Sequence, residues 1–261
     1  MSFIRVTKQN PCPICQHADW CRIFPDGYAE CMRVASPTAA KSGGWMHRLS
    51  AMPKKFIPPP PPFPSPPINA TKLHRDWLTQ TSPAALAALA TGLGVSARSL
   101  IAVDAAYAPP HAAWAFPMRD GHGNTIGIRL RNDQGKFAVR GSKQGIFTAN
   151  VTPQKTLYVC EGPTDTAAAI ELGLFAVGRP NCCCGGADVR TFARRHAVAT
   201  IVMISDNDQP GLDGARKVGV ELKMPFAIYV PPAKDVREFL RLGGTRLMLE
   251  NTLKGILWQN G

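Results

Sequence analysis

The chain has 261 residues, 45% of them apolar, which is enough to bury the core of one large domain or two small ones. Its formal charge of +12 favours an acidic partner, with nucleic acid as the first candidate. The start of the chain lacks the apolar core of a secretory signal, and no apolar run approaches the roughly 18 residues of a membrane span. We therefore expect a cytoplasmic protein with no membrane contact, whose cysteines are metal ligands or small buried side chains rather than disulfides.

The basic excess is uneven along the chain. The net charge is +5 over residues 1–56, +5 over residues 57–150 and +2 over residues 151–261. The acids collect in the last segment, which fits a basic channel that leads to an acidic metal site.

A proline-rich stretch marks the clearest boundary in the sequence. Pro58–Pro67 reads PPPPPFPSPP, and proline lacks the N–H that a helix or a central strand needs. The stretch predicts a polyproline II spacer of about 30 Å, at ~3.1 Å per residue. A ligand for an SH3-like domain is the alternative. We therefore expect a small module over 1–56, a linker over 57–70 and a larger C-terminal body.

Four cysteines lie within a short N-terminal segment, at Cys12, Cys15, Cys21 and Cys31. The spacing C-x2-C-x5-C-x9-C, in a segment too small for a core of its own, predicts structural Zn²⁺ held by four thiolates. His17 or His47 in place of one cysteine is one alternative, and unrelated free thiols are another.

Aromatic and basic side chains surround these cysteines and would contact single-stranded bases by stacking and by charge. They are Trp20, Arg22, Arg33, Trp45, His47 and Arg48. For Trp45, packing against the zinc module is an equal alternative.

The body begins with a mixed α+β pattern over residues 71–150. Alanine- and leucine-rich segments predict helices over 71–79, 82–93 and 97–101. Strand-like runs follow at 113–118, 125–130 and 136–139. Asp120-Gly121 and Gly123-Asn124 are turn signals between the first two runs, so we expect antiparallel hairpins.

From Thr156 to the end of the chain the pattern changes to an α/β alternation. Continuous apolar runs stand at 157–160, 175–177, 201–204 and 226–230, with candidate helices at 164–172, 187–196 and 211–222. Such runs are typical of strands buried on both faces, so we expect a four-stranded parallel sheet with right-handed connections in a domain over 151–261. A last helix over 245–257 would pack on this domain or, as the alternative, dock a partner.

Acidic residues follow two of these strands. Glu161 and Asp165 come after the first, and Asp206 and Asp208 after the third. Ligands of open α/β sheets bind beyond the carboxyl ends of the strands, and crowded carboxylates are costly unless a cation such as Mg²⁺ neutralises them. Solvated loop acids are the alternative for each residue alone, but the combination favours a metal site.

The segments that contain these acids resemble a known protein family. The segments EGPTD (161–165) and ISDNDQPG (204–211) resemble the Toprim domain shared by bacterial primases, topoisomerases and some nucleases. PPAKDVREFL (231–240) is similar to the segment that closes this domain in DnaG-type primases. The stretches at 113–131 and 135–147 resemble the primase subdomain that precedes Toprim. The resemblance implies a Rossmann-like α/β domain behind a mixed subdomain.

The resemblance also implies roles for the charged residues. Glu161, Asp206 and Asp208 would hold a catalytic Mg²⁺ or Mn²⁺, with Asp165 and Asp235 as supporting acids. The residues that would face the template or a nucleotide phosphate are Arg129, Arg131, Lys136, Arg140, Lys143, Arg179 and Lys234. A solvated surface role is the alternative for Arg140 and Lys143. Val236-Arg237 replaces the family's Pro-Asp, which weakens the case for a second metal near Asp235.

The two cysteine groups differ in this comparison. The N-terminal spacing, followed by GGWMHRL at 43–49, is more similar to the zinc modules of phage and mobile-element primases than to those of DnaG proteins. Such a module implies selection of the template start site. Cys182–Cys184 cannot easily point at one metal, because the three residues are consecutive, so we expect small buried side chains there.

Taken together, the sequence predicts a DNA primase that makes short RNA primers from nucleoside triphosphates on single-stranded DNA. A Toprim nuclease is the first alternative, and a non-catalytic zinc/Toprim protein that binds single-stranded DNA is the second. A topoisomerase would need a nucleophilic tyrosine on further large domains. No G-x-x-x-x-G-K-[ST] motif occurs, so we expect a replicative helicase on another chain.

Overall fold

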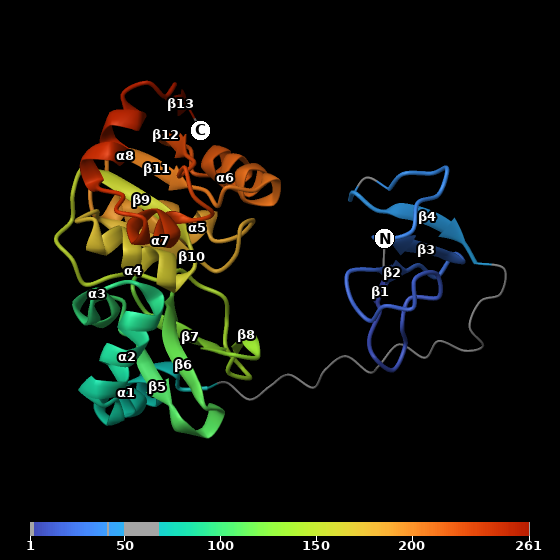
Figure 1. Ribbon diagram of the computed structural model, residues 1–261, viewed down its shortest axis with the longest axis horizontal. Coiled ribbons are helices and arrows are strands. Elements are labelled where there is room, and N and C mark those ends of the chain that lie inside the picture. The colour runs from blue at the N-terminus through green and yellow to red at the C-terminus, as the bar shows by residue number, and fades with distance from the viewer. Residues whose placement is uncertain (1–2, 41, 50–67, 261) are drawn as a thin grey trace. The chain divides into compact units, whose positions relative to one another are not determined.

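The computed structural model describes residues 3–40, 42–49 and 68–260 (Figure 1). The chain divides into two compact units, residues 1–64 and 65–261, which we describe separately. The expected polyproline spacer, Pro58–Pro67, lies outside the described residues.

Unit 1 is built on a four-stranded antiparallel sheet in the order β1-β2-β3-β4. Its strands are β1 (Ile4–Arg5), β2 (Arg22–Ile23), β3 (Tyr28–Cys31) and β4 (Trp45–Arg48). Its buried hydrophobic cluster consists of Val6, Ile23 and the three cysteines Cys12, Cys21 and Cys31. This core is as small as the sequence predicts, and most of it is sulfur-bearing side chains.

The first part of unit 2 is a mixed α+β layer, as predicted. Its helices are α1 (Ala70–Gln80), α2 (Pro83–Leu93) and α3 (Ala97–Ala102). Its antiparallel sheet contains β5 (Ala106–Ala108), β6 (Ala113–Arg119), β7 (Thr125–Asn132) and β8 (Gly135–Ala138), in that order, with the 3₁₀ turn η1 (Pro109–His111) after β5. Strand β5 was not predicted, because three residues are too few for a periodic pattern to appear.

The second part of unit 2 is a sheet in the order β10-β9-β11-β12-β13. Its strands are β9 (Thr156–Glu161), β10 (Ala176–Arg179), β11 (Thr200–Ile204), β12 (Pro225–Tyr229) and β13 (Gln259–Asn260). The first four pair in parallel, which confirms the predicted α/β sheet, and β13 pairs antiparallel with β12 at the edge. The helices are α4 (Pro163–Glu171), α5 (Gly186–Arg195), α6 (Gln209–Glu221), α7 (Val236–Arg241) and α8 (Arg246–Leu253).

Helices cover both faces of this sheet. One core cluster joins it to α5 and α6, through residues such as Phe192 and Val218. The other joins it to α4, α7 and α8, through Ala168, Phe239 and Leu249. Helix α8 is shorter than predicted, and it packs on the sheet. In the described part of the chain, no helix has the length and apolar character needed to cross a membrane.

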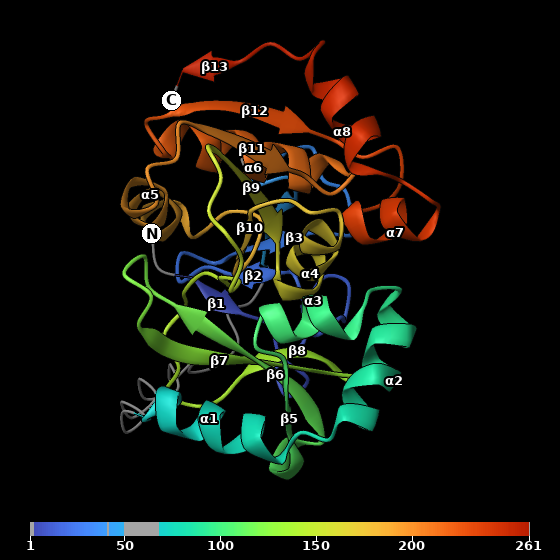
Figure 2. The same cartoon turned by 90° about the vertical axis from the view of Figure 1, so that its left-hand side faces the viewer.

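The two sheets of unit 2 are joined through the segment 146–147, which bridges β6 and β10, and Figure 2 shows one sheet above the other. The backbone amides of Phe147 and Gly178 each donate to the other's carbonyl, both at 2.8 Å. Phe116, Phe147 and Ala167 share one buried cluster that spans both parts of the unit. The mixed layer is therefore fixed against the ends of β9 and β10, where the acids lie.

Candidate active site

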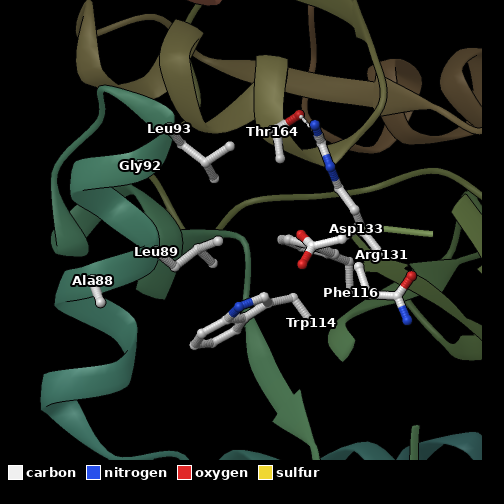
Figure 3. A pocket seen from close by; sticks show the side chains of 10 residues that line it. Ala88, Leu89, Gly92, Leu93, Trp114, Phe116, Arg131, Asp133 and Thr164 are labelled. Carbon is white, nitrogen blue, oxygen red and sulfur yellow. Dashed lines mark hydrogen bonds between the residues drawn. The ribbon is translucent and has the colours of Figure 1, made fainter. Parts of the chain in front are cut away.

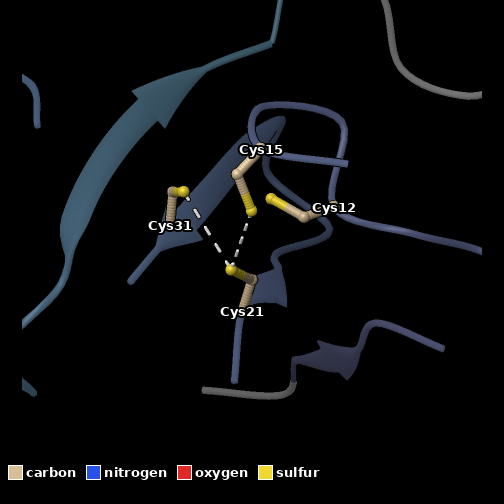
Figure 4. Close-up of side chains that lie close together, drawn as sticks. All are labelled: Cys12, Cys15, Cys21 and Cys31. Carbon is tan, nitrogen blue, oxygen red and sulfur yellow. Dashed lines mark hydrogen bonds between the residues drawn. The ribbon is translucent and has the colours of Figure 1, made fainter. Parts of the chain in front are cut away.

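Four cysteine thiols meet in unit 1 (Figure 4). Their sulfur atoms all lie within 4.8 Å of one another, with Cys15 Sγ 3.7 Å and Cys31 Sγ 4.0 Å from Cys21 Sγ. Tetrahedral zinc with Zn–S bonds of about 2.3 Å separates its sulfurs by about 3.8 Å. The cluster therefore has the composition and size of a structural zinc site, as the sequence predicts.

Neither histidine of unit 1 belongs to this cluster. His17 Nδ1 lies 2.8 Å from the carbonyl oxygen of Cys15, and His47 Nε2 lies 2.9 Å from that of Val34. A ligand set in which a histidine replaces one cysteine is not supported.

Backbone amides support the thiolate form of the cluster. Met32 N donates to Cys21 Sγ at 3.4 Å, and Val34 N donates to Cys31 Sγ at 3.3 Å. Burial opposes ionisation of Cys15, but the His17 backbone amide and the neighbouring thiols lower its pKa to about 6. Burial raises the pKa of Cys21 to about 12. Bound zinc would keep all four sulfurs ionised despite this spread.

The residues predicted to contact bases differ in exposure. Trp20 is 76% exposed, and its backbone has a φ of +64°, which is rare for a bulky residue. Arg33 is held by Asp19 at 2.7 Å, and Trp45 is half-buried in β4. Trp20 is therefore the aromatic side chain of this set that is freest to stack on a base.

In unit 2 the acids lie at the carboxyl edge of the parallel sheet. Glu161 ends β9, while Asp206 and Asp208 follow β11, the neighbouring strand. The chain places β10 on one side of β9 and then crosses to β11 on the other side. This reversal is the topological switch point at which open α/β sheets bind ligands.

The acids share one electrostatic environment. Burial raises the pKa of Asp206 to about 6, and the charges of Glu161, Asp235 and Asp208 also raise it. Burial also raises the pKa of Asp165 to about 7, and its Oδ1 atom is buried with no hydrogen-bond partner. Carboxylates crowded in this way fit a divalent cation. Among the described residues, however, only the cysteines bring three or more ligand atoms within 4.8 Å of one another.

Two of the acids also cap helices, which the sequence reasoning missed. Asp208 Oδ1 accepts from Gly211 N at the start of α6, and Asp235 Oδ1 accepts from Glu238 N at the start of α7, both at 2.7 Å. Asp235 and Glu238 have the spacing of a capping box, a signal that was available in the sequence. These caps fix the loops that carry Asp208 and Asp235.

Two predicted basic residues lie among the acids. Arg131 Nη1 donates to Thr164 Oγ1 at 2.9 Å, and burial lowers the Arg131 pKa while the charges of Asp165 and Asp235 oppose that shift. The exposed Lys136 lowers the pKa of both Asp165 and Asp206. The structure therefore brings β7 and β8 cations to the acidic edge of the parallel sheet.

The other predicted basic residues are placed differently. Arg179 is fully buried beside Glu161, its register partner, and its guanidinium donates to the carbonyl of Cys182. Arg129 Nη2 donates to the carbonyl of Pro180 at 3.3 Å. The remaining three, Arg140, Lys143 and Lys234, are exposed. A phosphate contact of Arg179 stays a prediction, because none of its surface is exposed.

The expectation of small buried side chains at Cys182–Cys184 was wrong. Cys182 is half-buried, and Cys183 and Cys184 are exposed. The backbone of this loop is what packs: a Cβ placed on Gly214 of α6 would lie 2.3 Å from the Cys182 carbonyl oxygen. With the backbone held against α6 and Arg179, the following thiols point outward.

A cavity of about 460 Å³ lies beside Arg131 and Thr164. Figure 3 shows Leu89 and Leu93 of α2 on one side, with Trp114 and Arg131 across from them. An aromatic ring beside charged groups suits a flat polar ring such as a nucleobase. The sequence did not reveal this cavity, because its walls come from separate elements.

Comparison with solved structures identifies the fold. The chain is similar to the E. coli primase catalytic core, with a TM-score of 0.57 at 15% identity over 72% of this chain and 79% of that one. It is also similar to the zinc-binding and RNA polymerase domains of Aquifex aeolicus primase, with a TM-score of 0.59 at 13% identity over 73% of this chain and 60% of that one. For the primase fragment of the bacteriophage T7 primase-helicase, the TM-score is 0.51 at 17% identity over 95% and 99%.

No protein-family model and no curated protein sequence matches the chain. The structural likeness confirms that the resemblance to DnaG-type and phage primases holds at the level of the fold. At these identities it establishes the fold alone.

Proposed function

We propose that this protein is a DNA primase, which joins ribonucleotides into short primers on a single-stranded DNA template. The observation that carries the proposal is the position of Glu161, Asp206 and Asp208 at the ends of neighbouring strands of a primase-like fold, with Lys136 close enough to lower the pKa of Asp206. One similar structure, a DnaG primase catalytic domain, is bound to single-stranded DNA. The net charge of +12 is consistent with the same kind of partner.

The residues have the chemistry that this reaction needs. A 3′-hydroxyl attacks the α-phosphate of a nucleoside triphosphate and pyrophosphate leaves, so catalysis consists mainly of positioning and charge neutralisation. Mg²⁺ or Mn²⁺ held by Glu161, Asp206 and Asp208 would neutralise the charge on the phosphate oxygens. Lys136 and Arg131 would hold the triphosphate beside these acids, and Asp165 and Asp235 would support them.

Protonation of Asp206 sets a lower pH limit for this site. Its pKa of about 6 means that protons compete with the cation as the pH falls toward that value. Synthesis at low metal concentration is therefore expected to fall below about pH 6, and added metal should shift this limit to lower pH.

Unit 1 would serve the reaction as a zinc-bound reader of the template. The Cys12, Cys15, Cys21 and Cys31 cluster would hold Zn²⁺, and the exposed Trp20 would stack on a template base. Strand separation would come from a replicative helicase on another chain.

The test is primer synthesis on mixed-sequence single-stranded DNA with labelled nucleoside triphosphates and Mg²⁺ or Mn²⁺. Asp206→Asn is expected to lower synthesis by at least about 100-fold, because it removes a charge that holds the cation, and to leave DNA binding largely intact. Asp213→Asn, the same substitution at an exposed position of α6, should keep full synthesis.

The other outcomes separate the alternatives. Metal-dependent cutting of the template without primers would identify a nuclease. Salt-sensitive DNA binding with neither synthesis nor cutting would indicate a binding protein. Undiminished synthesis by Asp206→Asn would refute the assignment of the metal site.

A further inference from the structure

Arg237 on α7 connects two buried acids of unit 2. Its Nη2 atom lies 3.1 Å from Asp235 Oδ2, and its Nε atom lies 3.9 Å from Asp165 Oδ1. The side chains of Asp165 and Asp235 are only 11% and 9% exposed. One guanidinium therefore stands between carboxylates from the start of α4 and the start of α7.

Such a pair of carboxylates needs a cation. Two buried like charges raise each other's pKa, and a cation between them relieves that cost. The charge of Arg237 opposes the effect of burial on the pKa of Asp165. Asp165 Oδ1 nevertheless has no hydrogen-bond partner, so its compensation is mainly electrostatic. Arg131 is the other guanidinium close to this pair, and its own hydrogen bond goes to Thr164.

The cap at the start of α7 shows that this arrangement is built into the fold. Asp235 Oδ1 is used by the α7 N-terminus, and its Oδ2 is left for Arg237. Arg237 also belongs to the first turn of α7, two residues after Asp235, so the same helix start fixes both partners. Arg237 is 24% exposed and lines a cavity of about 360 Å³, so solvent ions reach the position.

We infer that Arg237 is a fixed internal cation that occupies the place of a divalent ion between Asp165 and Asp235. The exchangeable metal is thereby confined to the side of the site formed by Glu161, Asp206 and Asp208. Arg237 is a positioning residue in this scheme: its guanidinium pairs with both Asp165 and Asp235, so that this pair needs no bound ion. The inference about the exchangeable metal rests on the proposed function, whereas the Arg237 ion pairs do not.

The experiment counts Mn²⁺ ions bound by the full chain, loaded with zinc, from the loss of the free Mn²⁺ signal in electron paramagnetic resonance. Arg237→Ala is expected to bind one Mn²⁺ more per chain than the wild type, because the two carboxylates lose their cation. Arg237→Lys keeps the charge and should keep the wild-type number. Arg241→Ala removes an exposed arginine of the same helix and the same cavity, and should also keep it.

A second arm works in a chain that retains Arg237. Asp165→Asn should change the Mn²⁺ dissociation constant less than about threefold, whereas Asp206→Asn should raise it at least about tenfold. Circular dichroism checks that each variant is folded. An Asp165→Asn effect as large as that of Asp206→Asn would overturn the inference, as would a folded Arg237→Ala variant with no additional ion.

These outcomes are distinguishable from failure of the proposed function. If the wild type makes no primers but the Arg237→Ala variant binds one Mn²⁺ more than the wild type, the result supports the role of Arg237 and counts against the primase assignment. If the wild type makes primers but binds a Mn²⁺ through Asp165, the result supports the primase assignment and overturns the role of Arg237.

Discussion

Unit 1 and the parallel sheet of unit 2 both gather metal-ligating side chains, but they differ in what else supports them. The hydrophobic cluster of unit 1 has five buried residues, three of which are cysteines of the thiol cluster. Each face of the parallel sheet has a buried cluster of fifteen residues. This difference indicates that a metal in unit 1 would be needed for folding. A metal in unit 2 would take part in chemistry, because the core of unit 2 is large enough to fold without it.

The ligand sets reflect the same contrast. The thiols lie within 4.8 Å of one another and receive backbone N–H groups, so little has to move to bind zinc. Burial and the neighbouring carboxylates raise the pKa of Asp206, and Asp208 and Asp235 are tied to helix starts. The thiols would suit a permanently bound metal, whereas under the proposed function the acids would hold an exchangeable ion.

The largest expected effect tests whether unit 1 depends on its metal. Cys31→Ser should lose stoichiometric zinc and unfold unit 1, because apparent zinc binding contributes about 10 kcal/mol or more to such modules. The melting of unit 2 should be unchanged. Zinc content is measured by mass spectrometry and folding by amide NMR. Cys184→Ser, an exposed thiol outside the cluster, is the control that should keep zinc.

Full zinc content in Cys31→Ser would contradict the proposed dependence of unit 1 on its metal, because the four-cysteine cluster would then not be needed to bind zinc. Unfolding of both units would contradict the independent stability of unit 2, because unit 2 would then depend on unit 1.

An intermediate effect tests the buried charge of unit 2. The pKa of Asp165 is about 7 when folded and lower when unfolded, so the folded state binds its proton more tightly. The stability that this group contributes is complete below about pH 4 and is lost as the pH rises through 7. An asparagine at position 165 does not titrate, so the unfolding free energy of Asp165→Asn should rise relative to that of the wild type by on the order of 4 kcal/mol across that range.

The measurement is urea unfolding without divalent metal at a series of pH values, followed by a signal from unit 2. Asp213→Asn should show no such pH-dependent difference, because Asp213 is exposed. A difference between Asp165→Asn and the wild type that stays constant with pH would contradict the raised pKa.

The smallest effect tests whether unit 2 is stabilised by many small contributions. Ser82 Oγ accepts from Ala85 N at 3.1 Å and caps α2. Ser82→Ala should lower the unfolding free energy of unit 2 by about 1 kcal/mol and leave zinc binding unchanged. Ser82→Asn keeps a capping oxygen and should recover most of the loss. Denaturant titration measures all three proteins, and a loss above about 3 kcal/mol would show that a single cap dominates.

Several features of this protein were determined by the sequence alone, because they depend on local pattern. Continuous apolar runs predicted the parallel strands, since a strand covered on both faces has no polar side. Cysteine spacing predicted the thiol cluster, and the position of Glu161 and Asp206 after two of the four runs predicted the acidic edge. Each of these signals can be read from residue types and their spacing along the chain.

Other features were decided only by tertiary structure, because they depend on which distant segments pack together. Strand β13 forms because the end of the chain returns to β12, and Cys183 is exposed because the loop backbone packs on α6. The salt bridges of Arg237 need α4 and α7 side by side. The sequence placed an arginine two residues after Asp235, but only the fold brought Asp165 to the other side of its guanidinium.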